Sequence, residues 1–155
     1  MPTLTADLYD ERGDSLDSLC VQFQDVGGVA EFDGPVRTVR CHRDNALVKA
    51  TLQTPGAGAV LVIDGGGSLE SALVGDQIAA SAVRNGWAGI IVFGAIRDRA
   101  AIGEMALGVK ALGSNPRKSA KDGAGEVDVP VQIAGVTFTP GAHVWADCDG
   151  VLVER

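Results

Sequence analysis

The sequence contains few residues suited to disulfide or soft-metal chemistry. Its three cysteines, Cys20, Cys41 and Cys148, are odd in number and show no CxxC spacing, and only His42 and His143 could supply imidazole ligands. A disulfide framework needs paired cysteines, and a structural zinc site needs closely spaced Cys or His ligands. The sequence therefore indicates neither a disulfide-stabilised scaffold nor a histidine-rich metal site.

Basic residues are also scarce, and no long apolar run is present. The 13 Lys and Arg residues are outnumbered by 20 Asp and Glu residues, which gives a net charge of -7 and leaves no basic stretch for phosphate contacts. The longest apolar runs, 57–63 and 89–95, are far shorter than the ~20 residues of a membrane-spanning helix. Residues 1–7 lack the basic and apolar regions of a secretory signal. We therefore expect a cytoplasmic protein that binds neither nucleic acid nor membrane directly.

Glycine is the residue type present in excess. The chain has 21 glycines, where an average composition would give roughly eleven, and they separate short apolar segments as tight turns do. The run 65–67 belongs to neither a GxGxxG nor a GxxxxGK[ST] motif, so nucleotide binding is not indicated. With 46% hydrophobic and 21% charged residues, the composition is globular, and the length predicts one domain over residues 1–155.

A βαβ unit is predicted in the middle of the chain, over residues 59–94. Residues 59–64 and 89–94 are continuous apolar runs that are typical of fully buried strands. Between them, Asp76 precedes a helical stripe of apolar residues, and Gly86 stands where a helix C′ residue is expected. Strand, helix and strand in this order predict an α/β fold in which the two strands are parallel neighbours.

Outside this unit, apolar spacing predicts short helices before it and short strands after it. We expect helices over 4–9 and 15–23, a strand over 36–41 after the turn signal 33–35, and a helix that Asp44 or Asn45 caps and that runs through Leu52. Residues 115–125 are expected to form a flexible loop. The strands predicted to extend the same sheet in the C-terminal half are 129–133, 136–139, 144–146 and 151–153.

Polar residues follow both apolar strands, at the edge where parallel α/β sheets bind their ligands. A helix that begins at Asp76 would present free N–H groups to a carboxylate or phosphate. Arg97 can add a bidentate positive charge, and the Asp98 and Asp76 carboxylates suit a divalent ion such as Mg²⁺. The predicted site for an anionic substrate and a cation consists of Gly75, Asp76, Gln77, Ile78, Arg97 and Asp98.

A structural interpretation of the same residues stays open at this point. Asp76 could be only a helix N-cap, and Arg97 and Asp98 could be only an ion pair at the surface. No lysine is singled out for Schiff-base chemistry. The lysines that we interpret as solvated surface charges are Lys49, Lys110, Lys118 and Lys121.

Short stretches that match one known family are spread along the chain. They are 5–8, 26–28, 32–35, 60–67, 75–76, 85–87, 94–98, 115–119 and 147–151. In these stretches the sequence resembles the RraA-like family, which is named for regulator of ribonuclease activity A and also contains the 4-hydroxy-4-methyl-2-oxoglutarate aldolases. Aldolase members carry an Asp, twenty residues and then Arg-Asp. Here Asp76 is followed after twenty residues by Arg97-Asp98.

The resemblance implies a lyase that depends on a divalent metal cation, Mg²⁺ or Mn²⁺. Such a class II aldolase cleaves 4-hydroxy-4-methyl-2-oxoglutarate and decarboxylates oxaloacetate, two small 2-oxo acid substrates, through a metal-stabilised pyruvate enolate. The resemblance implies that Asp98 binds the metal, that Arg97 and Asp76 act in catalysis, and that Arg97 and the Gly75–Ile78 backbone hold the substrate oxygens. It also implies a swivelling ββα fold like the phosphohistidine domain, and a homotrimer or a dimer of trimers.

The same family implies a second function of another class. A member can be a non-catalytic regulator that inhibits a ribonuclease of the E type through a protein–protein contact, and retention of Asp76, Arg97 and Asp98 favours the enzyme over it. Some members have been labelled methyltransferases, which the missing nucleotide motif does not support.

Two features depart from the family pattern. Residues 140–142 are Pro-Gly-Ala, where many relatives have Pro-Gly-Asp, and this change affects a turn. The sequence ends at Arg155, without the extension that in longer aldolases supplies an acidic residue to a neighbour's site. We therefore expect decarboxylation rather than efficient aldol cleavage.

Overall fold

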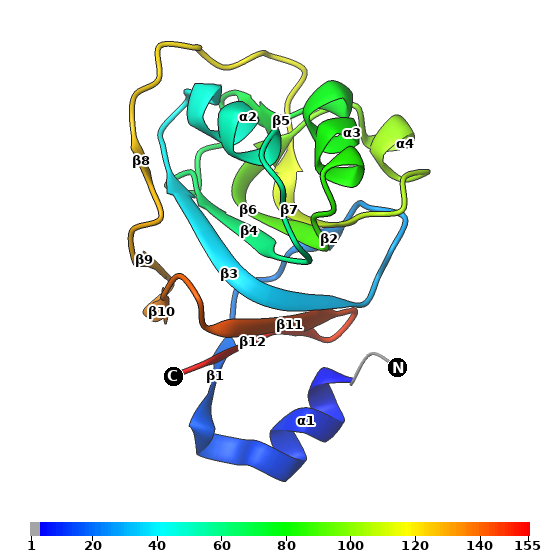
Figure 1. The fold of residues 1–155 in the computed structure, drawn as a ribbon, viewed down its shortest axis with the longest axis vertical. Helices are drawn as coiled ribbons and strands as arrows, with labels where there is room; N and C mark the ends of the chain where they lie inside the picture. Colours follow the sequence, from blue (N-terminus) through cyan, green and yellow to red (C-terminus); the bar gives the residue numbers. More distant parts are fainter. Residues whose placement is uncertain (1–3) are drawn as a thin grey trace.

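The computed structural model describes residues 4–155 and shows a mixed α/β fold built on a large, mostly β sheet (Figure 1). Residues 1–3, the beginning of the segment in which no secretory signal was expected, lie outside the described residues. The sheet has ten strands, eight of which follow the order β1-β12-β11-β3-β4-β6-β7-β2, while β5 pairs with β6 and β8 pairs with β3. Within the described part of the chain, no helix is long and apolar enough to cross a membrane.

The predicted βαβ unit is confirmed. Strands β4 (Val60–Asp64) and β6 (Gly89–Ile96) are parallel neighbours, and α3 (Asp76–Arg84) lies between them in the sequence. The unit also contains β5 (Ala72–Val74), a short strand parallel to β6 that the sequence pattern did not predict. On the other side of β6, β7 (Gly108–Ser114) adds a further parallel strand. All of these strands therefore direct their carboxyl ends to the same edge of the sheet.

The second half of the sheet is antiparallel and joins the two ends of the chain. Strand β3 (Phe32–Arg40) pairs with β4 in parallel and with β11 (His143–Asp147) antiparallel, and β12 (Gly150–Glu154) follows β11. The helix predicted over 15–23 is wrong, because β1 (Leu16–Leu19) pairs with β12. Leu16 and Leu19 are both buried and three residues apart, a spacing that imitates a helix. The expected turn at 33–35 is likewise part of β3.

The remaining elements are short. Helix α1 spans Thr5–Arg12 and lies beyond β11 and β12, whereas α2 (Ala46–Leu52) and α4 (Arg99–Ile102) lie on the same side of the sheet as α3 (Figure 1). Asn45, one of the two residues predicted to cap α2, occupies its N-cap position but makes no side-chain capping hydrogen bond, while Asp44 Oδ1 accepts the N–H of Ala46 at 3.1 Å. The other elements are the 3-10 turn Gly13–Ser15, β2 (Gln24–Asp25), β8 (Glu126–Val127), β9 (Val131–Ile133) and β10 (Val136–Phe138). Strands β9 and β10 form a separate two-stranded sheet, so these two segments do not extend the main sheet as predicted.

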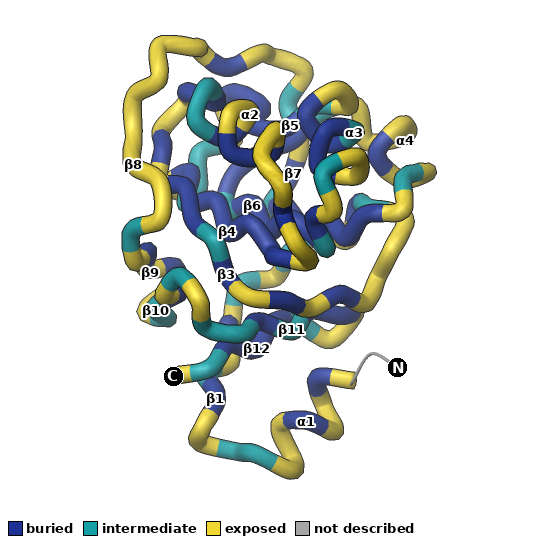
Figure 2. Tube along the Cα trace, viewed as in Figure 1, coloured by how far each residue is buried: buried dark blue, intermediate teal, exposed yellow. Residues whose placement is uncertain are grey.

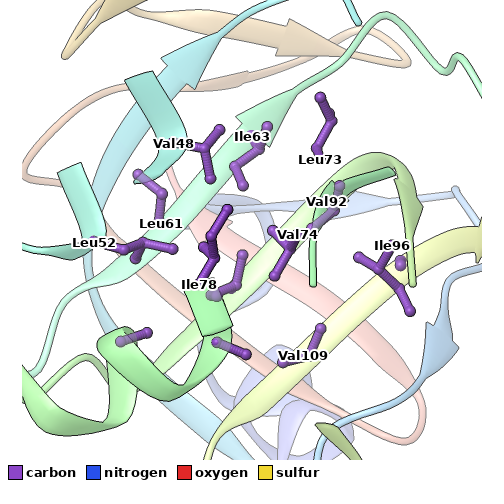
Figure 3. Packing of buried hydrophobic residues seen from close by; sticks show 14 of the residues in the cluster. Val48, Leu52, Leu61, Ile63, Leu73, Val74, Ile78, Val92, Ile96 and Val109 are labelled. Atoms are coloured by element: carbon purple, nitrogen blue, oxygen red, sulfur yellow. The ribbon is translucent and has the colours of Figure 1, made fainter. Parts of the chain in front are cut away.

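Two hydrophobic clusters cover the two faces of the parallel strands, and β4 and β6 are buried along most of their length (Figure 2). One face packs against the helices, where Val48 and Leu52 of α2 and Ile78 of α3 meet Leu61 and Ile63 of β4 (Figure 3). Leu52, Leu61 and Ile63 are fully buried, so truncating one of them to alanine costs about 2–5 kcal/mol. The helix starts are therefore held rigidly against the strand ends.

Candidate functional site

The predicted site residues meet where α3 begins and β6 ends. Gly75 is the N-cap residue of α3 and Asp76 is its first helical residue, so the N–H groups of Gln77 and Ile78 have no acceptor within the helix. Gly75 and not Asp76 occupies the N-cap position, so the interpretation of Asp76 as an N-cap is wrong. The two free N–H groups, of Gln77 and Ile78, lie at the positive end of the helix dipole.

Arg97 and Asp98 follow β6 directly and face this helix start. The Asp98 Oδ2 accepts the N–H of Asp76 at 3.0 Å, and the Arg97 Nη1 donates to the carbonyl of Pro116 at 3.3 Å. The Arg97 Nε lies 4.0 Å from Asp98 Oδ2, and both side chains are about two-fifths exposed. An exposed pair at this distance contributes little to stability, so a purely structural role explains these residues poorly.

Asp98 also has an unusual backbone conformation. Its φ is +60° and its ψ is +42°, in the left-handed region that few non-glycine residues adopt. Residues with a strained backbone conformation of this kind cluster at functional sites, where the strain orients a side chain. Here it turns the Asp98 carboxylate back toward Gly75 and the start of α3, since a Cβ on Gly75 would lie 2.9 Å from Asp98 Oδ2.

A cavity of about 410 Å³ opens at this junction between α2 and α3. All five predicted substrate-binding residues line it: Gly75, Asp76, Gln77, Ile78 and Arg97. Asp98 does not line this cavity; it lines an adjoining one of about 340 Å³ that shares Arg97. The structure therefore brings the predicted substrate site together as one cavity and places the predicted metal ligand at its edge, on the other side of Arg97.

The cavity is strongly cationic although the whole chain is acidic. Five basic side chains and one carboxylate, Asp76, line it, whereas the chain as a whole carries a net charge of -7. Charge of one sign that gathers in a concave site attracts ligands of the opposite sign. The five basic residues are Lys49, Arg84, Arg97, Lys118 and Lys121.

Several cavity residues, Arg84 among them, were missed or misread in the sequence. Lys49, Lys118 and Lys121 are exposed, as surface lysines are, but they surround the cavity. Asn45 was considered only as a cap, yet its side chain is buried, donates to the Leu73 carbonyl at 3.2 Å and accepts from Lys121 Nζ at 3.1 Å. The polar, basic composition of 115–121 could have pointed to Lys118 and Lys121, whereas Asn45 and Lys49 lie far from Arg97 in the sequence and show no local signal. Lys110 is also not a surface charge, because it is buried and paired with Asp25 at 2.7 Å.

A divalent cation suits this site if Asp98 is its protein ligand and water supplies most of its other ligands. Among residues 4–155, no three His, Cys, Asp or Glu side chains are grouped closely enough to enclose a metal ion. Mg²⁺ commonly keeps several waters and uses one or two carboxylates, and Asp98 has a second oxygen, Oδ1, that accepts no hydrogen bond from the described residues. Asp98 would thus be the residue that holds a solvated ion of this type.

Comparison with known proteins identifies the family and close structural neighbours. The chain matches the RraA-like family, described as Aldolase/RraA, over residues 5–153. A Geobacillus kaustophilus HTA426 structure described as S-adenosylmethionine: 2-dimethylmenaquinone methyltransferase is 47% identical, with a TM-score of 0.97 over 98% of this chain and 94% of that one. The RNA-processing inhibitor RraA from Thermus thermophilis is also 47% identical, with a TM-score of 0.96 over 99% and 93% of the two chains. Streptomyces coelicolor RraAS2, described as an unusual member of the RNase ES inhibitor RraA protein family, is 30% identical, with a TM-score of 0.80 over 100% and 81%.

Proposed function

Since the chain belongs to the RraA-like family, we propose that it is a metal-dependent lyase that decarboxylates oxaloacetate and cleaves 4-hydroxy-4-methyl-2-oxoglutarate. The observation that carries this proposal is the cationic cavity at the start of α3, with Arg97 in its wall and Asp98 at its edge. Both reactions break a C3–C4 bond of a 2-oxo acid and leave pyruvate as its enolate. One anion site therefore serves both reactions.

In this proposal the start of α3 binds the 1-carboxylate of the substrate. The N–H groups of Gln77 and Ile78 donate to it, and Gly75 leaves room for the Arg97 and Asp98 side chains beside it. The Arg97 guanidinium, which the Pro116 carbonyl holds at the cavity wall, donates to the 2-oxo oxygen. These contacts fix the reacting carbons before any bond breaks.

The chemical step transfers the electron pair of the C3–C4 bond to the keto group. In oxaloacetate, CO₂ leaves, negative charge develops on the 2-oxo oxygen, and a proton from water then reaches C3. Arg97 stabilises that developing charge, and loss of one such donor typically costs about 10²–10³ in rate. Asp76, exposed at the cavity wall, holds the water that supplies the proton. Asp98 would hold a divalent cation, which would supply Lewis-acid stabilisation of the developing negative charge.

Further cations of the cavity suit the second carboxylate of these substrates. Lys118 and Lys121 line the cavity in addition to Arg97, and Asn45 holds the Lys121 ammonium by a hydrogen bond of 3.1 Å. Both proposed substrates carry two carboxylates, which matches a cavity lined by several cations. Neutral or singly charged 2-oxo acids would leave these cations without a partner.

The experiment that tests this function is a coupled assay for pyruvate. Oxaloacetate and 4-hydroxy-4-methyl-2-oxoglutarate are supplied separately, each with Mg²⁺, with Mn²⁺ and with excess chelator. We expect metal-dependent release of pyruvate above the rate of the free metal ion, with oxaloacetate the faster substrate. Rates equal to the free-metal background for both substrates would overturn the proposal.

A second candidate function is inhibition of a ribonuclease through a protein–protein contact. The observation in its favour is the likeness to the Thermus and Streptomyces proteins, which are described as inhibitors of RNA processing and of RNase ES. Such a function requires an exposed surface, but it does not require the Arg97 or Asp98 side chain. A ribonuclease E assay with wild-type protein and with Arg97→Ala separates the two functions, because a regulator keeps its inhibition in the variant. We do not extend the methyltransferase name of the Geobacillus protein to this chain, which has no GxGxxG motif.

We further propose that the chain is one domain of the swivelling ββα type that assembles as a homotrimer. A single family match extends over residues 5–153, and the neighbours at 47% identity superpose on nearly the whole chain. The trimer follows from the family resemblance, in which the sites lie near subunit interfaces. The position of Asp98 at the outer edge of the cavity supports such an arrangement, since it leaves this side accessible to a neighbouring subunit.

A further inference from the structure

Asp44 is a buried carboxylate that the proposed mechanism does not use. Its side chain is only 3% exposed, and none of the ion pairs among residues 4–155 includes it. A buried charge is costly unless hydrogen bonds replace its lost water. Asp44 obtains this replacement from the backbone alone.

Four backbone N–H groups donate to the Asp44 carboxylate. One belongs to α2, from Ala46 to Oδ1 at 3.1 Å. The other three belong to the segment after Lys121, from Asp122 at 2.9 Å, Gly123 at 3.3 Å and Ala124 at 3.4 Å. Burial raises the pKa of Asp44, but these hydrogen bonds outweigh burial and hold the pKa below its usual value. The carboxylate therefore stays charged and fastens two distant parts of the chain together.

The segment that Asp44 holds in place also carries Lys118 and Lys121, two lysines that line the cavity and that we call the lysine wall. Its other end is fixed to β5, where Ser119 Oγ donates to the Ala72 carbonyl at 2.7 Å and Ala72 N–H donates to the Arg117 carbonyl at 2.8 Å. Lys118 thus lies within the anchor at β5, and Lys121 directly precedes the anchor at Asp44. The predicted loop is irregular, as expected, but hydrogen bonds tie it down along its length, where it passes around the outside of α2 toward β8 (Figure 1).

We propose that Asp44 is a positioning residue, whose hydrogen bonds hold Lys121 against Asn45 so that the lysine wall binds the second carboxylate of the substrate. The Asn45 N–H donates to the Ala120 carbonyl at 3.0 Å, and the Lys121 Nζ donates to Asn45 Oδ1 at 3.1 Å. Without the Asp44 charge, residues 122–124 are no longer held at a fixed distance from α2, and the side chains of Lys118 and Lys121 are no longer held in position at the cavity. The inference rests on the function proposed above. It assigns the preference for substrates with two carboxylates to Asp44, which does not line the cavity that contains Arg97.

The test compares two ligands that differ in the second carboxylate. Pyruvate has one carboxylate, and 2-oxoglutarate has two but cannot lose CO₂ through a pyruvate-type enolate. Calorimetric titration with Mg²⁺ present is expected to show tighter binding of 2-oxoglutarate by wild-type protein, by about tenfold, the equivalent of one charge-assisted hydrogen bond. Asp44→Asn is expected to remove this preference and to leave the Kd of pyruvate within about twofold. Lys121→Ala, which removes the cation itself, should give the same pattern.

Asp147→Asn is the matched control. Asp147 is a second buried carboxylate, 4% exposed, that accepts backbone N–H groups from Thr5 and Asp149, but it lies on β11 and lines no part of the cavity. This variant removes a similar buried charge and should keep the full preference for 2-oxoglutarate. If Asp44→Asn does not fold, Gly123→Val disturbs the same segment, because φ is +85° at this glycine and no atom lies within 4 Å of an added Cβ.

Each outcome decides the proposal. Loss of the preference in Asp44→Asn or Gly123→Val, with the preference kept in Asp147→Asn, supports it. The proposal for Asp44 would be overturned if the preference persisted in Asp44→Asn, or if the Kd values of both ligands increased by the same factor. Either result would show a merely structural role for Asp44 and would leave the proposed lyase function unaffected. Wild-type protein that binds both ligands equally would overturn the lysine wall and with it the role of Asp44, whereas the pyruvate assay decides the lyase separately.

Discussion

At the scale of single residues, Gly75 shows how closely the site is packed. Its φ of -119° is open to any residue, so no backbone strain requires glycine here. An added Cβ would instead lie 2.9 Å from Asp98 Oδ2 and 3.3 Å from Arg97 Nε. The site, and not the fold, therefore requires a glycine at this position.

Gly75→Ala is expected to lower oxaloacetate decarboxylation by about 10²-fold, because it displaces the Arg97 and Asp98 side chains. Its free energy of unfolding should change by no more than about 1 kcal/mol, since only half-exposed side chains have to move. Urea unfolding and steady-state kinetics on the same preparation check both parts. Unchanged kinetics would show that this contact is not part of the site.

Cys41 gives a second prediction at this scale. Burial, together with the smaller effect of the neighbouring carboxylates of Asp44 and Asp64, raises the pKa of its thiol to about 12. The thiolate is the reactive form, so Cys41 should resist a disulfide reagent at pH 8 while the exposed Cys20 and Cys148 react. Two thiols titrated in native protein and three in denaturant are expected; rapid reaction of all three would contradict the packing around Cys41.

At the scale of elements, α1 is fastened to the sheet by one carboxylate. Asp147 on β11 accepts the N–H of Thr5 at 2.8 Å and its hydroxyl at 2.7 Å. Burial raises the pKa of Asp147, but hydrogen bonds from Thr5, Asp149 and Gly150 lower it below its usual value. The lowered pKa means that the charged form stabilises the folded state. This contribution is complete above the unfolded pKa of about 3.9 and is lost as the pH falls through the lower folded pKa.

Asp147→Asn is therefore expected to destabilise the protein at pH 7 by about 1–3 kcal/mol, the cost of leaving buried donors without their acceptor. Wild type and variant should begin to converge as the pH falls below about 4, where the unfolded wild-type chain binds a proton at Asp147, and should converge fully once the pH has passed the lower folded pKa. Unfolding by urea at pH 7 and at pH 3 measures the two differences. A stability difference that is as large at pH 3 as at pH 7 would exclude ionisation of Asp147 as the cause.

The elements that could be predicted from the sequence are those in which the element's own burial determines the spacing of its apolar residues. Strands β4 and β6 are buried on both faces, and α3 has one apolar face, so each has a distinct pattern. Strand β7 was missed because Lys110 interrupts its apolar run, and this lysine is buried only because Asp25 of β2 pairs with it. Strand β1 was predicted as a helix because its partner, β12, lies at the other end of the chain.

At the scale of the whole molecule, the site was predictable where it follows the sheet and not where it depends on a distant loop. Arg97, Asp76 and the start of α3 lie at the carboxyl ends of parallel strands, where ligand sites are expected. Lys118 and Lys121 reach the same cavity through an irregular segment that Asp44 and Ser119 hold in place. Contacts of this kind depend on tertiary structure, and no local pattern encodes them.

The homotrimer is the prediction that belongs to this scale. Light scattering at micromolar concentration is expected to give a mass of about 48 kDa, three times the 15.9 kDa of the chain. The mass should stay constant on moderate dilution, as closed symmetric oligomers generally do. A mass near that of one chain would contradict the trimer, and a mass twice as large would indicate a dimer of trimers.

The most direct measurement of the central claim is metal-dependent oxaloacetate decarboxylation by Arg97→Ala and Asp98→Asn. Both side chains are about two-fifths exposed, and Asn tolerates the left-handed backbone of position 98 as Asp does, so both variants should fold. Each is expected to lose about 10²–10³ in rate, and a higher Mg²⁺ concentration should restore activity partly in Asp98→Asn but little in Arg97→Ala. If both variants decarboxylate oxaloacetate at the wild-type rate above the free-metal background, the lyase proposal is wrong.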